Sequence, residues 1–352
     1  MSHELESELG FSQAEIVDCL AREGLLSLEL EFTKECNLRC IYCYASAGDA
    51  LEGELSLDEL VSIIEQAKQL GARRIVLLGG GEPFLFPHVR QVIRHIHSLG
   101  LSQAIFTNGM LLTKNLCRFL FDHQVKVAIK CNSFLPAIQD GLAGVPGAHR
   151  LIQRGLRLLL ESGYPGEGRP LCIQSIVCPQ NRDEIEEMWI WAREKGITPY
   201  FEMLTNQGRV RQNAQLAISS EEIHSIFQRL AVIDRERFGV RWIPRPPIAS
   251  FTCRRHLYSC LVNSQGFVQP CTGVDVSVGN IREKPLEAIL RESRAIHDLR
   301  RVYQDIDPSC RACHFAGDCY GCRGNAYQAT GNYLAADPAC WLKHTKGAEA
   351  CH

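Results

Sequence analysis

Three cysteines stand close together near the start of the chain, at Cys36, Cys40 and Cys43, with the spacing C-x3-C-x2-C and no fourth cysteine nearby. A cube of four irons and four sulfides normally takes four thiolate ligands. Three thiolates on one loop would leave one iron open to a small molecule, as a catalytic zinc site keeps an open position. The spacing predicts chemistry at a metal cluster, and the alternative is a zinc loop whose fourth ligand lies elsewhere.

A second motif, Gly79-Gly80-Gly81-Glu82-Pro83, follows a short apolar run. Glycines remove side chains where a ligand must approach the backbone closely. An ammonium group could be held there by backbone carbonyls and the Glu82 carboxylate. Alone, the segment could be only a turn, but beside an open iron it predicts a holder for the amino end of a ligand.

The chain has 17 cysteines, which is many for its 352 residues. In a reducing compartment, clustered cysteines bind metal more often than they pair as disulfides. Eight thiolates would suffice for two four-iron clusters or for two zinc sites, and C-x2-C pairs do not decide between them. These eight are Cys253, Cys260, Cys271, Cys310, Cys313, Cys319, Cys322 and Cys340.

The elements that must position these motifs come from hydrophobic periodicity. Short apolar runs alternate with amphipathic helices, which predicts parallel βαβ units and an α/β fold rolled into a partial (β/α)6 TIM-like barrel. Ligands of such sheets bind at the carboxyl ends of the strands, where the triad and the glycines fall. The expected strands are 26–32, 74–78, 103–107, 125–130, 171–177 and 198–203.

Periodicity fades after the proline-rich segment 244–247. We expect an N-terminal extension at 1–24, the barrel at 25–240, and a C-terminal domain at 241–352 that metal, more than a large core, holds together.

Composition excludes several classes of protein. The formal net charge of −2 is spread over both signs, so we expect no nucleic-acid partner. No signal peptide and no run of 18 apolar residues is visible, so we expect a cytoplasmic chain without a membrane span.

The triad, the aromatic Tyr42 before its third cysteine, and the Gly-Gly-Glu-Pro segment together closely resemble radical S-adenosylmethionine (radical SAM) enzymes. In that family the open iron chelates the amino and carboxylate groups of S-adenosylmethionine, whose reductive cleavage gives a 5′-deoxyadenosyl radical. The resemblance implies that the triad holds this cluster, that Gly80, Gly81 and Glu82 meet the ammonium group, and that backbone near Tyr42 meets adenine.

Two further cofactor-binding candidates lie at the end of the fourth strand and on the helix after it. Arg154 resembles, by position, the arginine that holds the methionine carboxylate. Lys130 stands where many relatives carry a small polar residue.

The C-terminal cysteines resemble the SPASM extension of some radical SAM enzymes, which carries two auxiliary [4Fe–4S] clusters. The resemblance implies three clusters in total. It assigns Cys253, Cys260, Cys271 and Cys322 to a nearer auxiliary cluster, and Cys310, Cys313, Cys319 and Cys340 to a farther one.

Two residues are candidates for proton or hydrogen transfer. Cys178 shares parity with Gln174 on the fifth strand, so it could face the barrel interior and donate a hydrogen atom to a substrate radical. Asp275 follows Cys271 by four residues and could act as a base, whereas sulfatase-maturing relatives place an acid directly after the corresponding cysteine and this chain has Thr272 there.

We therefore expect a radical SAM oxidoreductase that dehydrogenates or epimerises a small molecule such as a sugar or aminocyclitol, with flavodoxin or ferredoxin as electron donor. The short segment before the first strand favours a small molecule, because many peptide-modifying relatives carry a peptide-recognition module there. The alternatives are a peptide-modifying maturase and, in another class, an iron–sulfur electron carrier or a zinc-stabilised binding protein.

Overall fold

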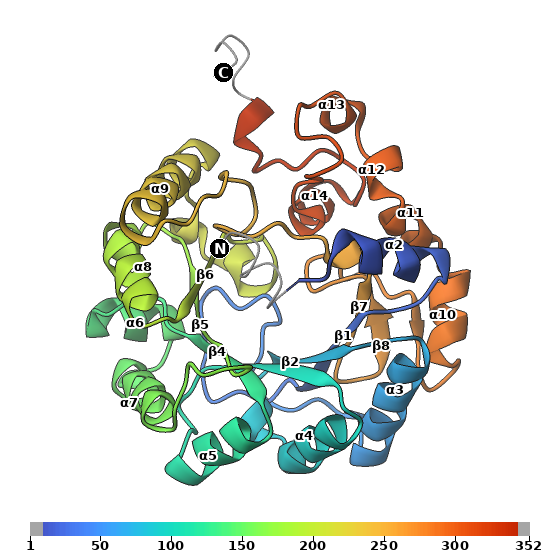
Figure 1. Cartoon of the computed structure of the whole chain (residues 1–352), viewed down its shortest axis with the longest axis horizontal. Coiled ribbons are helices and arrows are strands. Elements are labelled where there is room, and N and C mark those ends of the chain that lie inside the picture. Colours follow the sequence, from blue (N-terminus) through green and yellow to red (C-terminus); the bar gives the residue numbers. More distant parts are fainter. Residues whose placement is uncertain (1–9, 344–352) are drawn as a thin grey trace.

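The computed structural model describes residues 10–343 and contains one sheet with the strand order β6-β5-β4-β3-β2-β1-β7-β8-β9. Strands β1 to β6 pair in parallel, each with its neighbour in sequence, and β6 does not pair back onto β1. The sheet is therefore an open, partial barrel, which confirms the predicted fold class (Figure 1). These strands are β1 (Ser27–Thr33), β2 (Arg74–Gly80), β3 (Ser102–Thr107), β4 (Val125–Lys130), β5 (Leu171–Ile176) and β6 (Thr198–Glu202).

Helices cover the outside of these strands, and each buries an apolar face (Figure 1). The expected capping box is present, since the Ser56 hydroxyl accepts from Glu59 N and the Glu59 carboxylate accepts from Ser56 N. The covering helices are α3 (Leu57–Gln69), α4 (Val89–Ser98), α5 (Lys114–Asp122), α6 (Pro136–Ala143), α7 (Ala148–Glu161), α8 (Ile185–Glu194) and α9 (Ser220–Ile233).

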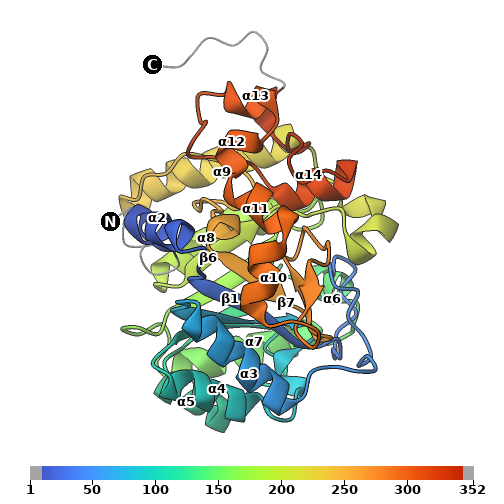
Figure 2. The same cartoon turned by 90° about the vertical axis from the view of Figure 1, so that its right-hand side faces the viewer.

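The C-terminal part continues the same sheet. Strand β7 (Ser259–Val262) pairs in parallel with β1, and β8 (Phe267–Gln269) and β9 (Gly279–Asn280) follow in antiparallel pairs. A division of the chain near residue 240 remains a prediction, because the sheet runs across it. Short helices follow; the first packs beside α3 over the sheet, and the later ones lie toward the C-terminal end of the molecule (Figure 2). They are α10 (Leu286–Glu292), α11 (Arg294–Arg300), α12 (Val302–Asp305), α13 (Pro308–Arg311) and α14 (Arg323–Thr330).

The N-terminal helix α2 (Gln13–Ala21) is capped by Ser12 and packs on this C-terminal part. Ile16 and Cys19 share a small apolar cluster with Leu257 and Tyr258.

Alternating residues of each barrel strand point to opposite faces. In β1, Leu28, Leu30 and Phe32 are fully buried in the main apolar core beneath the helices. The intervening Ser27 and Glu29 line a cavity inside the barrel. The barrel interior is thus partly hollow and lined by charged, aromatic and aliphatic side chains, whereas the layer between sheet and helices is the close-packed core.

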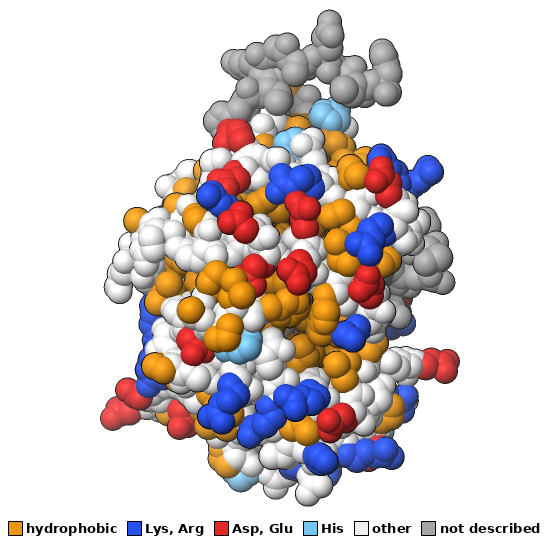
Figure 3. Space-filling model, turned by 90° about the vertical axis from the view of Figure 1, so that its left-hand side faces the viewer, with side chains coloured by type: hydrophobic (Ala, Val, Ile, Leu, Met, Phe, Trp, Pro, Cys, Tyr) orange, Lys and Arg blue, Asp and Glu red, His pale blue; other side chains and the backbone are white. Residues whose placement is uncertain are grey.

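On the face that includes α8 and α9, apolar side chains gather in a central band, with basic and acidic side chains around it (Figure 3). Both signs of charge occur on this face. Among residues 10–343, no helix is both long enough and apolar enough to cross a membrane.

Helices α8 and α9 are joined by a buried carboxylate. Asp234, at the end of α9, is fully buried and accepts hydrogen bonds from Trp189 Nε1 at 2.7 Å, Trp242 Nε1 at 2.9 Å and Arg193 Nε at 3.0 Å. The Arg193 side chain is itself only 8% exposed. A buried charge held in this way is costly to leave without its partner.

We predict that Asp234→Ala lowers the free energy of unfolding by about 3–5 kcal/mol, because it leaves the Arg193 guanidinium buried without its carboxylate. Urea denaturation followed by circular dichroism measures the loss. The control is Glu186→Ala, which removes an ion pair with Arg229 between the same helices, where both side chains are about half exposed. That variant should lose at most about 1 kcal/mol, and equal losses in the two variants would contradict the assignment.

Candidate active site

The cysteine triad lies on the loop directly after β1. Backbone hydrogen bonds fix this loop, since Cys36 N donates to Gly48 O at 2.8 Å and Ile41 N donates to Leu142 O at 3.1 Å. The three thiols come together closely enough to affect each other's ionisation, although burial is the main reason why the pKa of Cys36 rises to about 11 and that of Cys40 to about 12. The structure thus brings the predicted triad together.

The glycine turn follows β2 and packs against the triad loop. Gly81 N donates to Thr33 O at 2.7 Å and Glu82 N donates to Glu35 O at 2.8 Å. A Cβ on Gly81 would lie 1.9 Å from Glu35 O, so the two backbones leave no room for a side chain. The glycines are therefore required by the close approach of the triad loop.

Glu82 is 1% exposed and braces the turn against the end of β3. Its carboxylate accepts hydrogen bonds from Thr107 Oγ1 at 2.7 Å and from Asn108 N at 2.8 Å. Burial raises the pKa of Glu82 to about 7, against the lowering effect of these hydrogen bonds. A cationic group beside it would favour the ionised form.

Tyr42 and Lys130 connect the triad loop with β4. The Asn132 side-chain amide donates to the Tyr42 hydroxyl at 2.6 Å, and Asn132 Oδ1 accepts from Ile176 N at 3.0 Å. The Lys130 ammonium lies near enough to Cys40 to favour its thiolate. Lys130 therefore provides positive charge beside the triad.

These groups line one cavity of about 220 Å³, which we call the triad cavity. It is open on one side to the thiols and the glycine turn, and on the other to the barrel interior and the loop after Cys271. Its lining includes Cys36, Cys40, Cys43, Gly79, Gly80, Gly81, Glu82, Lys130, Gln174, Glu202, Arg255 and Thr272.

Arg154 is not part of this cavity. It is exposed on α7, where its Nη2 donates to Met110 O at 2.9 Å. The prediction relied on the place of Arg154 in the sequence, and the structure puts this residue on a face of α7 that does not meet the cavity.

Cys178 also lies outside the cavity. The parity argument assumed that the fifth strand continues to residue 178, but β5 ends at Ile176. Cys178 is fully buried beyond this end, where its backbone N donates to Asn181 Oδ1 at 3.0 Å. The thiol of β5 that does line the barrel interior is that of Cys172.

Among the C-terminal cysteines, the structure groups the four predicted for the farther cluster. The pKa of Cys340 is raised mainly by burial, with smaller contributions from Cys319 and Cys310, and that of Cys319 in the same way with a contribution from Cys313. These electrostatic contributions place the four thiols near one another.

Only three of the four cysteines predicted for the nearer cluster come together. Burial raises the pKa of Cys271 to about 12 and that of Cys322 higher still, with smaller contributions from the neighbouring Cys253. The fourth, Cys260, lies opposite Leu28 in the β1–β7 pair and is fully buried in the main apolar core. The strand places its side chain on the helix-covered face, so the structure does not bring Cys260 to the other three.

Across residues 10–343, no three His, Cys, Asp or Glu side chains converge as tightly as the ligands of a single metal ion. A four-iron cube binds each thiolate through a different iron, so its thiols stand farther apart.

Asp275 does not line either cavity described for the barrel. Both of its carboxylate oxygens accept side-chain amides at 2.9 Å, one from Gln207 and the other from Gln328. Gln207 also donates to Thr272 O, so Asp275 organises the loop after Cys271. Two residues along, Arg209 donates to Cys40 O at 3.2 Å and thereby joins this region to the triad loop.

Sequence reasoning missed several residues of the barrel interior. Arg255 and Glu29 form an ion pair at 3.2 Å; Arg255 and Tyr200 line the triad cavity, whereas Glu29 lines the second cavity of the barrel. Strand parity could have found Glu29 and Tyr200, because they share a face with Glu31 and Glu202 respectively. No sequence signal marks Arg255, which lies outside the barrel strands.

The residues present fit a cluster and an amino-acid ligand. Thiols suit iron–sulfur ligation, and backbone N–H groups already donate to them, from Leu38 to Cys36 Sγ and from Ala47 to Cys43 Sγ, both at 3.4 Å. The glycine turn offers bare backbone beside the Glu82 carboxylate.

Comparison with known proteins agrees with this geometry. A model of the radical SAM superfamily matches residues 30–191, and a model of the SPASM iron–sulfur cluster-binding domain matches residues 253–314. The chain is 29% identical to the AdoMet-dependent heme synthase of Methanosarcina barkeri, over 88% of this chain and 94% of that protein. It is 26% identical to the PqqA peptide cyclase of Rhizobium meliloti, over 90% of this chain and 86% of that protein.

Among solved structures, Streptococcus suis SuiB bound to its precursor peptide SuiA aligns with a TM-score of 0.71 and 17% identity, covering 94% of this chain and 80% of that one. This similarity is one of fold.

We predict that Gly81→Ala weakens binding of S-adenosylmethionine by about ten- to a hundredfold, because the added Cβ forces the turn away from the triad loop and so removes a hydrogen bond to the charged ammonium group of the ligand. Isothermal titration of the anaerobically reconstituted protein measures this affinity. The control is Gly141→Ala in α6, where an added Cβ meets no atom within 4 Å. Unchanged affinity in Gly81→Ala would show that the turn does not contact the ligand.

Proposed function

Because the chain belongs to the radical SAM superfamily and carries a SPASM domain, we propose that it is an oxidoreductase that cleaves S-adenosylmethionine and oxidises a small molecule inside its barrel. The observation that carries the proposal is the triad cavity. One continuous space contains the triad thiols, the glycine turn and the loop after Cys271. A substrate in this space would lie between the triad and the C-terminal cysteines.

In this proposal Cys36, Cys40 and Cys43 hold a [4Fe–4S] cluster, and the glycine turn with Glu82 receives the ammonium group of S-adenosylmethionine. When bound, the cluster and this cofactor supply a 5′-deoxyadenosyl radical that abstracts hydrogen from the substrate. Lys130 offers positive charge for a carboxylate, and Tyr42, fixed by Asn132, forms a wall of the cavity.

We assign two auxiliary clusters to the C-terminal part, one to Cys253, Cys271 and Cys322 and the other to Cys310, Cys313, Cys319 and Cys340. Their role would be to accept the electron that the substrate radical loses. An external low-potential donor, flavodoxin or ferredoxin, would reduce the triad cluster. We propose dehydrogenation in preference to epimerisation, because Cys178, the hydrogen donor expected from the sequence, does not line the cavity.

The relative with 29% identity makes heme, so a tetrapyrrole is the first substrate class to test. The second candidate is a peptide, since the PqqA peptide cyclase matches at 26% identity over a similar length. Formation of 5′-deoxyadenosine with S-adenosylmethionine and dithionite should rise when the true substrate is added. Stimulation by coproporphyrin III, the tetrapyrrole named in the Fe-coproporphyrin III synthase of Methanosarcina barkeri (24% identical), supports the first class. Stimulation only by a peptide would replace it with the second.

We predict that Cys40→Ala abolishes formation of 5′-deoxyadenosine while leaving about two-thirds of the iron, because two of the three clusters keep their thiolates. Iron analysis and chromatography of the reaction products measure the two effects.

The matched control is Cys117→Ala, which removes a buried thiol of α5 outside the cavities. It should retain the iron and the activity. Full activity of Cys40→Ala, or equal iron loss in both variants, would refute the triad assignment.

A further inference from the structure

The C-terminal part contains a second place where two backbones touch. A Cβ on Gly273 would lie 2.7 Å from Gly324 Cα, and a Cβ on Gly324 would lie 2.8 Å from Gly273 Cα. This contact brings the segment of Cys271 against that of Cys322. With Cys253, these two cysteines form the three-thiol group proposed for the nearer auxiliary cluster, which we call the nearer site.

Backbone N–H groups already donate to two thiols of the nearer site. Val274 N donates to Cys271 Sγ at 3.3 Å, and Asn325 N donates to Cys322 Sγ at 3.4 Å. Hydrogen bonds to the sulfur atoms are among the factors that set the reduction potential of an iron–sulfur cluster. Any further N–H group beside this site therefore bears on that potential.

Arg323 follows Cys322 directly, and its side chain is fully buried. Its Nη1 donates to Tyr333 O at 3.1 Å and to Ala335 O at 2.6 Å. Its Nε and Nη2 have no hydrogen-bond partner among residues 10–343. A buried donor without an acceptor is costly, most of all on a charged group, so a bound group is expected to accept from these two nitrogens.

The acid beside Arg323 does not satisfy these two nitrogens. Asp337 and Arg323 both border Gly321, where a Cβ would lie 3.1 Å from Asp337 Oδ2 and 3.2 Å from Arg323 Nη2. Neither Nε nor Nη2 is hydrogen-bonded to Asp337, whose carboxylate accepts from Cys322 N at 2.7 Å and from Ala339 N at 2.9 Å. The carboxylate thus offsets the charge of Arg323 but leaves its two N–H groups to another acceptor.

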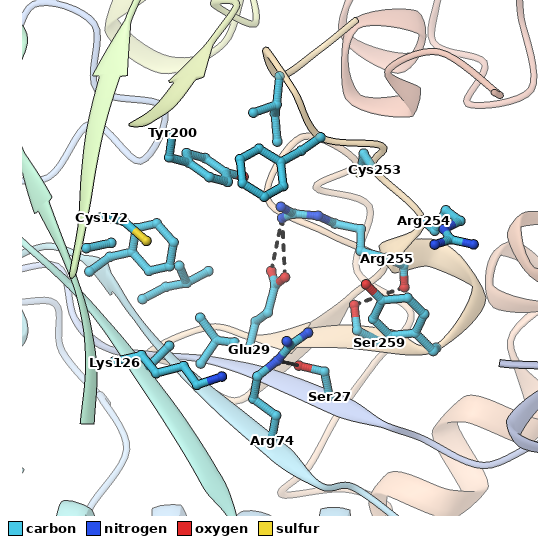
Figure 4. Close-up of a pocket in the computed structure, with 18 of the residues that line it drawn as sticks. Ser27, Glu29, Arg74, Lys126, Cys172, Tyr200, Cys253, Arg254, Arg255 and Ser259 are labelled. Carbon is cyan, nitrogen blue, oxygen red and sulfur yellow. Dashed lines mark hydrogen bonds and ion pairs between the residues drawn. The ribbon is translucent and has the colours of Figure 1, made fainter. Parts of the chain in front are cut away.

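His256 offers another N–H group, three residues after Cys253. The preceding Arg255 points into the barrel toward Glu29 (Figure 4). The His256 ring instead packs edge-on against Tyr320 of the C-terminal part, with ring centroids 5.6 Å apart, and is 5% exposed.

The ring proton of His256 is assigned to Nε2 by its neighbours. The buried Tyr320 hydroxyl lies 3.4 Å from His256 Nδ1 and needs an acceptor for its own proton, which Nδ1 provides. Burial and the charges of Arg255 and Arg323 lower the pKa of His256 to about 3, so the ring is neutral and carries its one proton on Nε2. This Nε2 also has no hydrogen-bond partner in the described part of the chain.

The three unpartnered nitrogens of Arg323 and His256 share their surroundings. The two side chains lie close enough for the guanidinium to act on the ionisation of the imidazole, and along the chain they follow Cys322 and Cys253. All three nitrogens are donors. A buried water molecule would bring two protons of its own, for which these nitrogens offer no acceptor. The sulfides and thiolates of a cluster present acceptors to such a group of donors.

We infer that Arg323 and His256 donate hydrogen bonds to sulfur atoms of the nearer auxiliary cluster and thereby raise its reduction potential. A hydrogen bond to sulfur stabilises the reduced cluster, which carries one more negative charge, more than it stabilises the oxidised cluster. This inference rests on the proposed function, which assigns an electron-accepting cluster to the nearer site. The two residues position N–H groups that make this cluster the better acceptor.

Two substitutions of His256 test the inference. The amide of His256→Gln can place an N–H group where Nε2 stood, whereas the amide of His256→Asn can place its oxygen where Nδ1 stood and keep the bond from Tyr320. We expect His256→Asn to shift the nearer cluster about tenfold toward its oxidised form, which is about 59 mV for a one-electron couple. His256→Gln should retain the original potential. The reverse pattern would show a role through Tyr320 alone and overturn the inference.

Arg323→Lys removes Nε and Nη2 but keeps the buried charge, and it should lower the potential of the same cluster. The control is Arg294→Lys on α11, where the side chain is 93% exposed and the potential should not change. Potentials are measured by titration followed by EPR, on the full-length chain in the Cys40→Ala background, where the auxiliary clusters alone contribute. An unchanged potential in His256→Asn and Arg323→Lys, with the iron content retained, would overturn the inference.

A measurement without substitutions at these residues covers variants that fail to hold the cluster. The chain is labelled with ¹⁵N in its histidine side chains, reduced, and studied by pulsed EPR. We expect a weak coupling of one labelled nitrogen to an auxiliary cluster. The absence of this coupling would overturn the inference, and so would the strong coupling of a directly bound imidazole.

Formation of 5′-deoxyadenosine separates this inference from the proposed function. If the chain cleaves S-adenosylmethionine but the potential of His256→Asn is unchanged, only the hydrogen-bonding inference fails. If the potentials follow the predicted pattern but 5′-deoxyadenosine never forms, the proposed function fails and the hydrogen bonds stand.

Discussion

The arrangement of the site depends on the contact between two backbones. The turn after β2 is bonded to the loop after β1 through Gly81 N to Thr33 O and Glu82 N to Glu35 O. This contact extends the parallel pairing of Thr33 with Gly80 past the end of the sheet. Both hydrogen bonds join main-chain groups. The distance between the triad and the turn is therefore set by the register of the two strands and does not depend on side-chain rotamers.

The barrel interior is packed less closely than the core around it. Beneath the helices, side chains pack closely, as protein interiors normally do. Inside the barrel, strand alternation places charged and aromatic residues whose packing leaves two neighbouring cavities, one beside the triad and one beside Cys253. Arg255 lines both cavities, and its ion pair with Glu29 joins a barrel strand to the C-terminal part. The barrel and the C-terminal part, which would exchange electrons through a substrate, are therefore also linked by an ion pair.

The barrel and the triad could be predicted from the sequence because both are local. Periodicity and caps set the strands, and β4 falls at Val125–Lys130 as expected. The site assignments that the structure does not gather around the triad depend on non-local contacts. Arg154 and Cys178 were placed by counting residues along one element. Counting does not tell which face of α7 meets the cavity, or at which residue β5 ends. Cys260 was grouped by resemblance to the SPASM extension, whereas the pairing of β7 with β1 turns its side chain into the core.

That pairing has a further consequence for the chain as a whole. Strand β1 has β2 on one side and β7 on the other, so it is an inner strand only because the C-terminal part is folded. A fragment that stopped at the apparent end of the barrel would expose the full hydrogen-bonding edge of β1, next to the triad loop. Unprotected edges of this kind recruit other chains and lead to aggregation. Separate expression of the two halves is thus expected to give insoluble material, and assembly of the N-terminal metal centre in cells would have to wait until synthesis has passed β7.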